Sequence, residues 1–293
     1  MLSSLAMFRP LFVTLRPHQW VKNLFVAAPL VFAKRLTDGE AVLRELAAVF
    51  VFCALAGAVY AYNDVLDAEA DRAHPTKRHR PIASGALAPR LALIASGALG
   101  LGALLGASLL SGAFVSVAVS YLILNLAYSV RLKEIAFVDV LSITTGFLLR
   151  VLGGALAIGV SPSPWLLVCT GLLASFLAFG KRAHELSQSS GTATRRVLSQ
   201  YDPKQLHAAL YALAALTVLS YAAYTQATHT IAFFGTERML WTTPFCLVGI
   251  GRFLVLTRRS AGDGPTEQML RDAPFMINLG LWGLAVLGII YFR

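Results

Sequence analysis

The sequence predicts an all-α polytopic membrane protein with about nine transmembrane helices. Three observations predict this class: 57% of the 293 residues are hydrophobic, only 14% are charged, and the mean hydropathy is +0.66. A soluble domain carries roughly 25% charged residues. This chain has too few charged residues to cover the water-exposed surface of a soluble protein of its size. We expect a single integral-membrane domain over residues 1–293.

Apolar segments long enough to cross a bilayer, which takes roughly 17–25 residues per helix, recur along the whole chain. The first contains Lys22 and Asn23 and is the least apolar of them. The separators are short and carry Gly, Pro or charge, as Asp38-Gly39 does. In order, the expected spans are 18–34, 43–63, 89–110, 112–129, 136–159, 164–181, 205–228, 239–257 and 274–292.

The Lys and Arg residues alternate between the loops. With a cytoplasmic N-terminus, eighteen of them fall on the cytoplasmic side and five on the opposite side. Basic residues that flank membrane helices set this orientation. The net charge of +10 therefore reflects membrane topology, and nucleic acid is excluded as a partner. Cys53, Cys169 and Cys246 stand singly in apolar runs, which indicates neither a disulfide nor a zinc site.

The acidic stretch at residues 63–71, which ends the second apolar run, is the most informative part of the chain. Successive helical residues turn by about 100°, so Asp64, Asp67 and Asp71 share a narrow sector with Asn63 at its edge, while Glu69 points away. Carboxylates crowded in this way repel one another unless a cation joins them, and such oxygen ligands suit Mg²⁺. The plain alternative is a solvated helix end.

A basic loop, Arg72 to Pro81, follows the acids at once. Pro75 and Pro81 interrupt any helix there. Lys and Arg beside a metal site bind phosphate oxygens as charge-assisted donors, so the pair of segments predicts a site for a metal-bound diphosphate. A loop that is basic only because of membrane topology is the alternative.

Two further polar clusters end apolar runs on the same expected side of the membrane. Each is typical of interfacial anchoring when taken alone, and together with the acidic stretch they indicate a polar cavity. The clusters comprise Tyr128 and Lys133, then Lys181, Arg182 and Glu185.

Arg150 falls inside the fifth apolar run. A charge at that depth costs several kcal/mol unless it faces a partner or a cavity. We expect Asp139 or a substrate phosphate as its partner, with a structural ion pair as the alternative. Lys22 lies about one turn into the first span, where it would either anchor the helix at the membrane interface or reach a lipid phosphate.

The motif NDxxDxxxD at 63–71, followed by PTKRxRP at 75–81, resembles the first aspartate-rich motif of the UbiA superfamily of intramembrane prenyltransferases. The resemblance covers nearly the whole chain. It implies nine helices around a cavity, Mg²⁺ as cofactor, a prenyl diphosphate donor and an aromatic or lipid acceptor. It also implies that the motif residues bind Mg²⁺–diphosphate, that two of them are catalytic, and that the loop contacts phosphate. In this sequence the metal residues are Asn63, Asp64, Asp67 and Asp71, the catalytic ones Asp64 and Asp67, and the phosphate contacts Lys77 and Arg80.

The chain departs from the common family pattern at the end of the sixth span. A second DxxxD motif is usual there, but this sequence reads GKRAHEL at 180–186. Together with RPHQWVKN at 16–23 and YSVRLK at 128–133, this resembles a phosphoribosyltransferase branch of the superfamily. In that branch the donor is phosphoribosyl diphosphate and the acceptor is a polyprenyl (decaprenyl-type) phosphate, which makes an arabinan precursor for the cell wall. A bacterial inner membrane, with the active site facing the cytoplasm, is the location this implies.

Under this interpretation, the lipid phosphate attacks ribose C1 while Mg²⁺ stabilises the departing diphosphate. Glu185 binds a sugar hydroxyl or a second metal, and both roles stay open. Two other functions also stay open, namely transfer from a prenyl diphosphate to an aromatic or lipid acceptor, and transport or lipid flipping. Whether the chain forms a homo-oligomer stays open too. The substrate-binding residues expected are Lys22, Lys77, Arg80, Tyr128, Lys133, Arg150, Lys181, Arg182 and Glu185.

Overall fold

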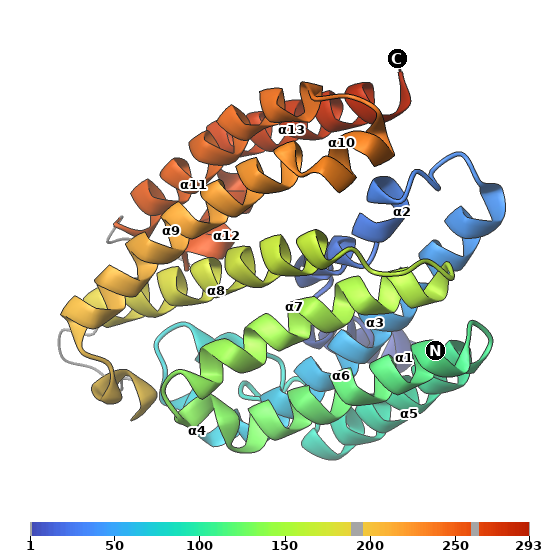
Figure 1. The fold of residues 1–293 in the computed structure, drawn as a ribbon. Helices are drawn as coiled ribbons and strands as arrows, with labels where there is room; N and C mark the ends of the chain where they lie inside the picture. Colours follow the sequence, from blue (N-terminus) through green and yellow to red (C-terminus); the bar gives the residue numbers. More distant parts are fainter. Residues whose placement is uncertain (1, 189–195, 259–263, 293) are drawn as a thin grey trace. The chain divides into compact units, whose positions relative to one another are not determined.

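The structure is a computed structural model that describes residues 2–188, 196–258 and 264–292 (Figure 1). Arg195, Arg259 and Arg293, which contribute to the charge bias, lie outside the described residues. The described residues form helices and contain no strand. The α-helices are α1 Leu2–Thr14, α2 Ala28–Phe32, α3 Gly39–Leu66, α4 Ala68–Arg72, α5 Pro89–Ser108, α6 Gly112–Val130, α7 Val138–Ala157, α8 Pro164–Ser187, α9 Pro203–Gln226, α10 Thr228–Phe234, α11 Thr243–Thr257, α12 Pro265–Arg271 and α13 Ala273–Tyr291. The 3-10 helices are η1 Pro17–Phe25, η2 Lys77–His79, η3 Leu132–Glu134, η4 Arg196–Gln200 and η5 Arg238–Thr242.

Eight helical segments in the described part of the chain are long and apolar enough to cross a membrane. This confirms the expected all-α membrane class. They are α3, α5, α6, α7, α8, α9, the combined segment Arg238–Thr257, and α13. The expected boundaries hold to within a few residues, except that α3 begins at Gly39 and α8 continues to Ser187.

The segment expected as the first span, 18–34, differs from the prediction. It forms the short helices η1 and α2 instead of one long helix. Arg16, just before η1, has a left-handed backbone with φ of 51°. Pro29 stands in the first turn of α2, where it lacks the N–H that would continue a preceding helix. The polar residues in the segment are accommodated by burial within protein, since Asn23 is 0% exposed.

The chain divides into two compact units, and we describe each by itself. Unit 1 comprises residues 1–133 and 146–162. In it α3 packs along α5 and α6 (Figure 1). The Phe52 ring stands edge-on to the rings of Phe114 and Tyr121, with centroids 6.0 and 5.1 Å away. These side chains belong to the apolar core of unit 1, which holds α3 and thereby positions its acidic end.

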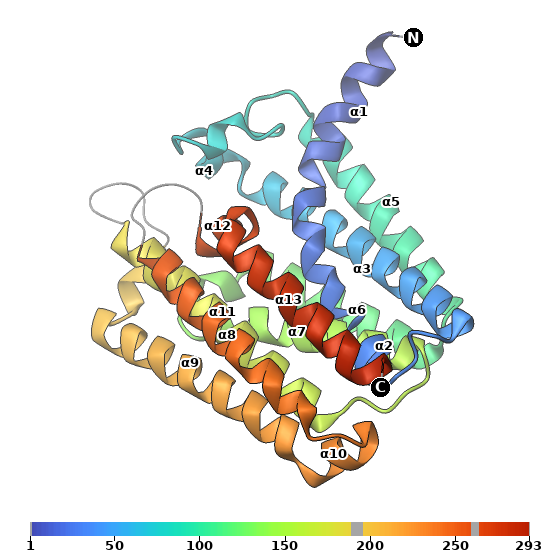
Figure 2. The same ribbon diagram turned by 90° about the horizontal axis from the view of Figure 1, so that it is seen from above.

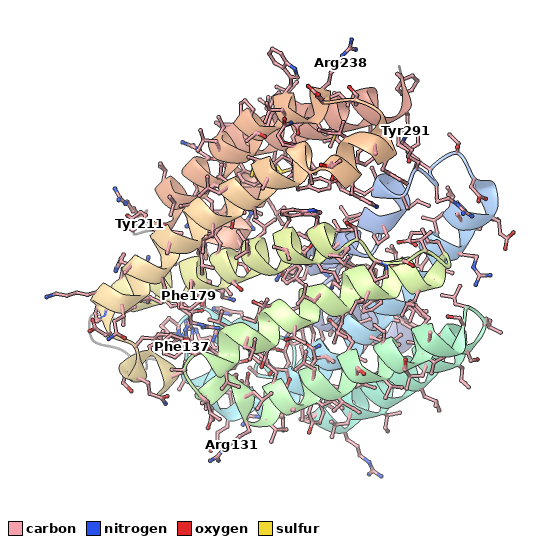
Figure 3. All side chains as sticks on the ribbon, viewed as in Figure 1. Arg131, Phe137, Phe179, Tyr211, Arg238 and Tyr291 are labelled. Carbon is pink, nitrogen blue, oxygen red and sulfur yellow. The ribbon has the colours of Figure 1, made fainter. Side chains whose placement is uncertain are left out.

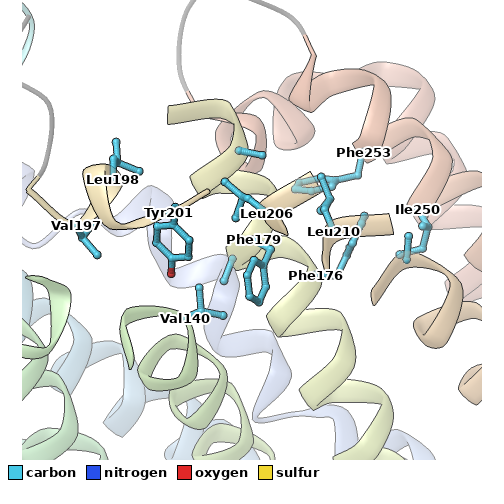
Figure 4. Close-up of a cluster of buried hydrophobic side chains, with 13 residues drawn as sticks. Val140, Phe176, Phe179, Val197, Leu198, Tyr201, Leu206, Leu210, Ile250 and Phe253 are labelled. Carbon is cyan, nitrogen blue, oxygen red and sulfur yellow. The ribbon is translucent and has the colours of Figure 1, made fainter. Parts of the chain in front are cut away.

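Unit 2 comprises residues 134–145 and 163–293. In it α8 packs along α9, and α11 lies against both (Figure 2). Figure 4 shows its buried core, in which the Phe176 and Phe253 rings lie 5.0 Å apart between centroids. A Cβ on Gly180 would lie 2.4 Å from the Phe253 ring, so glycine allows α8 and α11 to approach closely. That the two units form one domain stays a prediction.

Candidate active site

The acidic motif lies where α3 gives way to α4. Asp67 separates the two helices, yet its N–H donates to the Asn63 carbonyl at 2.9 Å. The Asp71 N–H likewise donates to the Asp67 carbonyl at 2.8 Å. Helical spacing therefore persists across the junction. Asp64 and Asp71 are buried while Glu69 is exposed, so the motif has one enclosed side and one open side.

Two arginines pair with the buried carboxylates of the acidic motif, Asp64 and Asp71. Arg16 Nη2 lies 2.5 Å from Asp64 Oδ1, and its guanidinium also lies over the Tyr60 ring. Arg80 Nη1 lies 3.2 Å from Asp64 Oδ1 and 2.6 Å from Asp71 Oδ2. Buried charge is tolerated only when it is paired. The basic loop thus folds back onto the acids that precede it in the sequence.

Asp67 has a different set of partners. Lys133 Nζ, from η3, lies 2.7 Å from Asp67 Oδ1 and donates to Asn63 Oδ1 at 3.3 Å. The Asn63 amide donates to Asp67 Oδ2 at 2.8 Å. Figure 3 shows that Arg131, two residues before Lys133, extends away from the ribbon instead. Of the two cations in this loop, only Lys133 is therefore directed at the motif.

The motif contains the donor types that a hard divalent cation takes, namely three carboxylates and an amide oxygen. Within the described residues, however, no three His, Cys, Asp or Glu side chains are close enough together to hold a metal. Arg16, Arg80 and Lys133 occupy the carboxylates instead. The ligand chemistry fits Mg²⁺, which would compete with these three cations for the same carboxylate oxygens.

Three other predicted residues of unit 1 are half-buried and make contacts of their own. Lys77 begins η2, the short helix of the basic loop. Tyr128 lies in the last turn of α6, and Lys22 lies near the end of η1. Their roles in substrate binding stay predictions.

Arg150 is buried in α7 with neutral partners. Its Nε donates to Asn23 Oδ1 at 2.8 Å, its Nη2 to the Tyr121 hydroxyl at 2.7 Å, and its Nη1 to the Gly146 carbonyl at 2.9 Å. The guanidinium also lies over the Tyr121 ring, at 4.8 Å from the centroid. The predicted pairing of Arg150 with Asp139 is wrong. Polar groups from η1 and α6 bind the Arg150 guanidinium instead. The phosphate alternative stays a prediction.

Asp139 is instead the centre of a buried cluster in unit 2. Its Oδ2 lies 2.7 Å from Arg182 Nε, and its Oδ1 accepts a 2.6 Å hydrogen bond from the Tyr201 hydroxyl. Arg182 also pairs with Glu185 one turn further along α8. Arg182 is 1% exposed and Asp139 is 0% exposed. Arg182 is therefore committed to protein carboxylates, whereas its neighbour Lys181 is half-buried and makes contacts of its own.

Tyr201 closes this cluster from the segment before α9. Its hydroxyl accepts the Phe137 N–H at 2.8 Å while donating to Asp139. Burial and the hydrogen bond to Asp139 raise the pKa of Tyr201 above its ordinary value. Figure 3 shows Phe137 near Phe179, whose ring centroid is 6.2 Å away. The start of α7 is thus attached to the end of α8.

Sequence reasoning did not identify Arg16 and Tyr201 as partners of the acidic groups. Arg16 lies in a quoted motif, RPHQWVKN, but its spacing from Asp64 carries no periodic signal. Tyr201 precedes an apolar run and resembles an ordinary interfacial aromatic. Only the fold brings either residue to its carboxylate.

Comparison with known proteins gives a consistent result. The model of the UbiA prenyltransferase family matches residues 24–279. A decaprenyl-phosphate phosphoribosyltransferase of Corynebacterium glutamicum is 33% identical over 94% of this chain and 85% of its own length. One of Mycobacterium tuberculosis is 34% identical over 92% of this chain and 90% of its own length.

Among solved structures, a UbiA homolog from Archaeoglobus fulgidus bound to GPP and Mg²⁺ has a TM-score of 0.73. It is 17% identical and covers 96% of this chain and 99% of its own. At that identity the likeness concerns the fold alone. It agrees with the helical architecture described above.

Proposed function

Because the chain belongs to the UbiA prenyltransferase family and is an integral-membrane transferase, we propose that it transfers 5-phosphoribose from phosphoribosyl diphosphate to a polyprenyl phosphate, releasing diphosphate. The main support is the pair of relatives that carry the name decaprenyl-phosphate phosphoribosyltransferase and match over nine-tenths of the chain. The basic sequence GKRAHEL, in place of a second acidic motif, supports a substrate set rich in phosphate.

The acidic motif is the proposed diphosphate site. Asn63, Asp64, Asp67 and Asp71 are the residues that would hold Mg²⁺, and Asp64 and Asp67 are the proposed catalytic residues. When bound, Mg²⁺ offsets negative charge on the leaving group. The solved UbiA homolog with Mg²⁺ supports this choice of metal.

Arg16, Arg80 and Lys133 already stand at the motif in contact with its carboxylates. We assign them a second role, in which each exchanges its carboxylate for a phosphate oxygen as the donor binds. Guanidinium groups suit this exchange, since they form paired hydrogen bonds to phosphate as readily as to carboxylate. Lys77 and Tyr128 supply further donors to the same groups.

The end of α8 is a second proposed substrate-binding segment, with Lys181, Arg182 and Glu185 as its residues. We assign the direct phosphate contact to Lys181, because Arg182 is 1% exposed and paired with Asp139. Arg182 then orients Glu185, with which it forms an ion pair. Glu185 binds a ribose hydroxyl or a second cation.

The acceptor phosphate is proposed to lie near Lys22 and Arg150. The printed hydrogen-bond partners of Arg150 are all neutral, so a phosphate would supply the opposite charge that a guanidinium at this depth requires. Because the acceptor oxygen is already anionic, no strong general base is needed. Catalysis then depends on positioning and on electrostatic stabilisation of the leaving group. The proposed location is a bacterial inner membrane with the site facing the cytoplasm, and the charge bias of the loops supports that orientation.

The test is donor choice. Purified protein with Mg²⁺ and a polyprenyl phosphate receives phosphoribosyl diphosphate or a prenyl diphosphate in separate reactions, and diphosphate release and the lipid product are measured. We expect release and a phosphoribosylated lipid with the first donor only. Turnover with the prenyl donor alone would favour ordinary prenyl transfer over this proposal. Transport or lipid flipping across a vesicle membrane, without turnover of either donor, would exclude both enzymatic functions.

A further inference from the structure

Glu45 is a buried acid far from the acidic motif. It lies in the second turn of α3, nineteen residues before Asp64 on the same helix, or roughly 28 Å along the axis at 1.5 Å per residue. Its side chain is 1% exposed. Within the described residues, neither carboxyl oxygen has a hydrogen-bond partner among the usual donors.

Gly154 shows what lies beside this carboxyl. A Cβ built on Gly154 would meet the Val26 carbonyl oxygen at 1.9 Å and Glu45 Oε1 at 2.6 Å. The two oxygens are therefore at most about 4.5 Å apart. Val26 caps η1 and is 0% exposed. The Glu45 carboxyl and the Val26 carbonyl thus lie beside the same space, which α7 leaves open only because Gly154 has no side chain.

The ionised form of Glu45 does not fit this environment. As a carboxylate, Glu45 would place one hydrogen-bond acceptor near another, the Val26 carbonyl, and an isolated buried carboxylate costs several kcal/mol. The nearby charged and titratable groups are engaged elsewhere. Arg44 donates to the carbonyls of Ala157 and Leu110. On the neighbouring elements, Arg150 donates hydrogen bonds to Asn23 and Tyr121, and the Asn23 amide donates one to Cys53. Lys22 is half-buried and makes contacts of its own.

We propose that Glu45 carries a proton and donates a hydrogen bond to the Val26 carbonyl, which makes it a positioning residue for η1. One proton converts the two neighbouring acceptors into a donor and an acceptor and removes the buried charge. The bond would attach the end of η1 to α3.

The consequence reaches the active site through η1. Arg16, just before this helix, holds Asp64, and Asn23 within it holds Arg150. Releasing the Val26 end would loosen both contacts. This effect on turnover rests on the proposed function, whereas the protonated carboxyl and its bond to Val26 do not.

The experiment uses the full chain with Glu45→Gln, Glu45→Leu and a control, Glu40→Gln. Glu40 is 81% exposed on the same helix. An infrared difference spectrum against wild type at neutral pH should lose a protonated-carboxyl C=O band in Glu45→Gln, and an ionised-carboxylate band in Glu40→Gln. An ionised-carboxylate loss in Glu45→Gln would overturn the proposal.

Backbone hydrogen exchange over residues 17–26 supplies the second readout. The glutamine amide can still donate to Val26, so exchange should match wild type, whereas leucine should accelerate it. The value of kcat/KM should stay within about twofold of wild type for the glutamine variant. It should fall about tenfold or more for the leucine variant, mainly because KM rises. Equal protection in the leucine variant would also overturn the proposal. If the leucine variant does not fold, the infrared result decides. Neither the infrared measurement nor the hydrogen-exchange measurement requires a substrate, so both test the proposal even if the donor proves to be different.

Discussion

Arg16 Nη2 lies 2.5 Å from Asp64 Oδ1, although the two residues are 48 positions apart. Asp64 is 3% exposed, and the bond joins the residue before η1 to the last turn of α3. A buried carboxylate without a cation is costly. The pairing therefore stabilises the fold, and in the proposed function it also places Arg16 beside the diphosphate site.

Replacing this arginine tests both effects. Arg16→Gln should lower the free energy of unfolding by about 2 kcal/mol, because a hydrogen bond to a charged group is lost. Diphosphate release should fall as well. Thermal unfolding in detergent and the release assay measure the two effects. Arg9→Gln removes an exposed arginine of α1 and should change neither; equal effects of both variants would show that only net charge matters.

The catalytic assignment predicts that Asp64→Asn and Asp67→Asn each reduce diphosphate release about 100-fold or more, as losses of electrostatic stabilisation do. The matched control is Glu69→Gln, since Glu69 belongs to the same acidic stretch but is exposed. The variants should remain folded by size-exclusion chromatography. Normal turnover by either aspartate variant would remove the metal assignment.

Charge reversal at Lys181 tests the proposed donor contact. Lys181→Glu should weaken the binding of phosphoribosyl diphosphate, because it places an anion where a phosphate is expected. Titration calorimetry in the presence of Mg²⁺ measures the Kd. Lys204→Glu, at an exposed position opening α9, is the control for net charge. Unchanged affinity in Lys181→Glu would place this residue outside the donor site.

Tyr201 should make stability depend on pH in the alkaline range. Burial and the bond to Asp139 raise its pKa above the ordinary value, which is about 10. A raised pKa in the folded state gives stability that is complete below the unfolded value and is lost as pH rises through the folded value. The Tm should therefore fall more steeply above pH ~10 in wild type than in Tyr201→Phe. Parallel slopes would contradict the prediction.

Gly154→Ala should destabilise unit 1, because the new methyl group would meet the Val26 carbonyl oxygen at 1.9 Å. Overpacking of this kind costs about 1–3 kcal/mol. Gly102→Ala is the matched control, a helical glycine of α5 with nothing within 4 Å of an added Cβ. Thermal unfolding compares the two, and a larger loss in the α5 variant would contradict the packing described.

Hydropathy and local spacing by themselves determined the membrane class, eight of the nine expected spans and the position of the acidic motif. These features depend on residues close in sequence, because a helix fixes which side chains share a face. The same reasoning failed at 18–34, where apolar content predicted one helix. There Pro17 and Pro29, together with the buried Asn23, produce two short helices.

Only the tertiary structure decided which cation meets which anion. Asp139 pairs with Arg182, while Arg150 binds the neutral groups of Asn23 and Tyr121. Nothing in the spacing of these residues distinguishes that arrangement from the reverse. Such choices depend on how helices pack around one another, since a buried charge takes the partner that the completed fold brings within hydrogen-bonding distance.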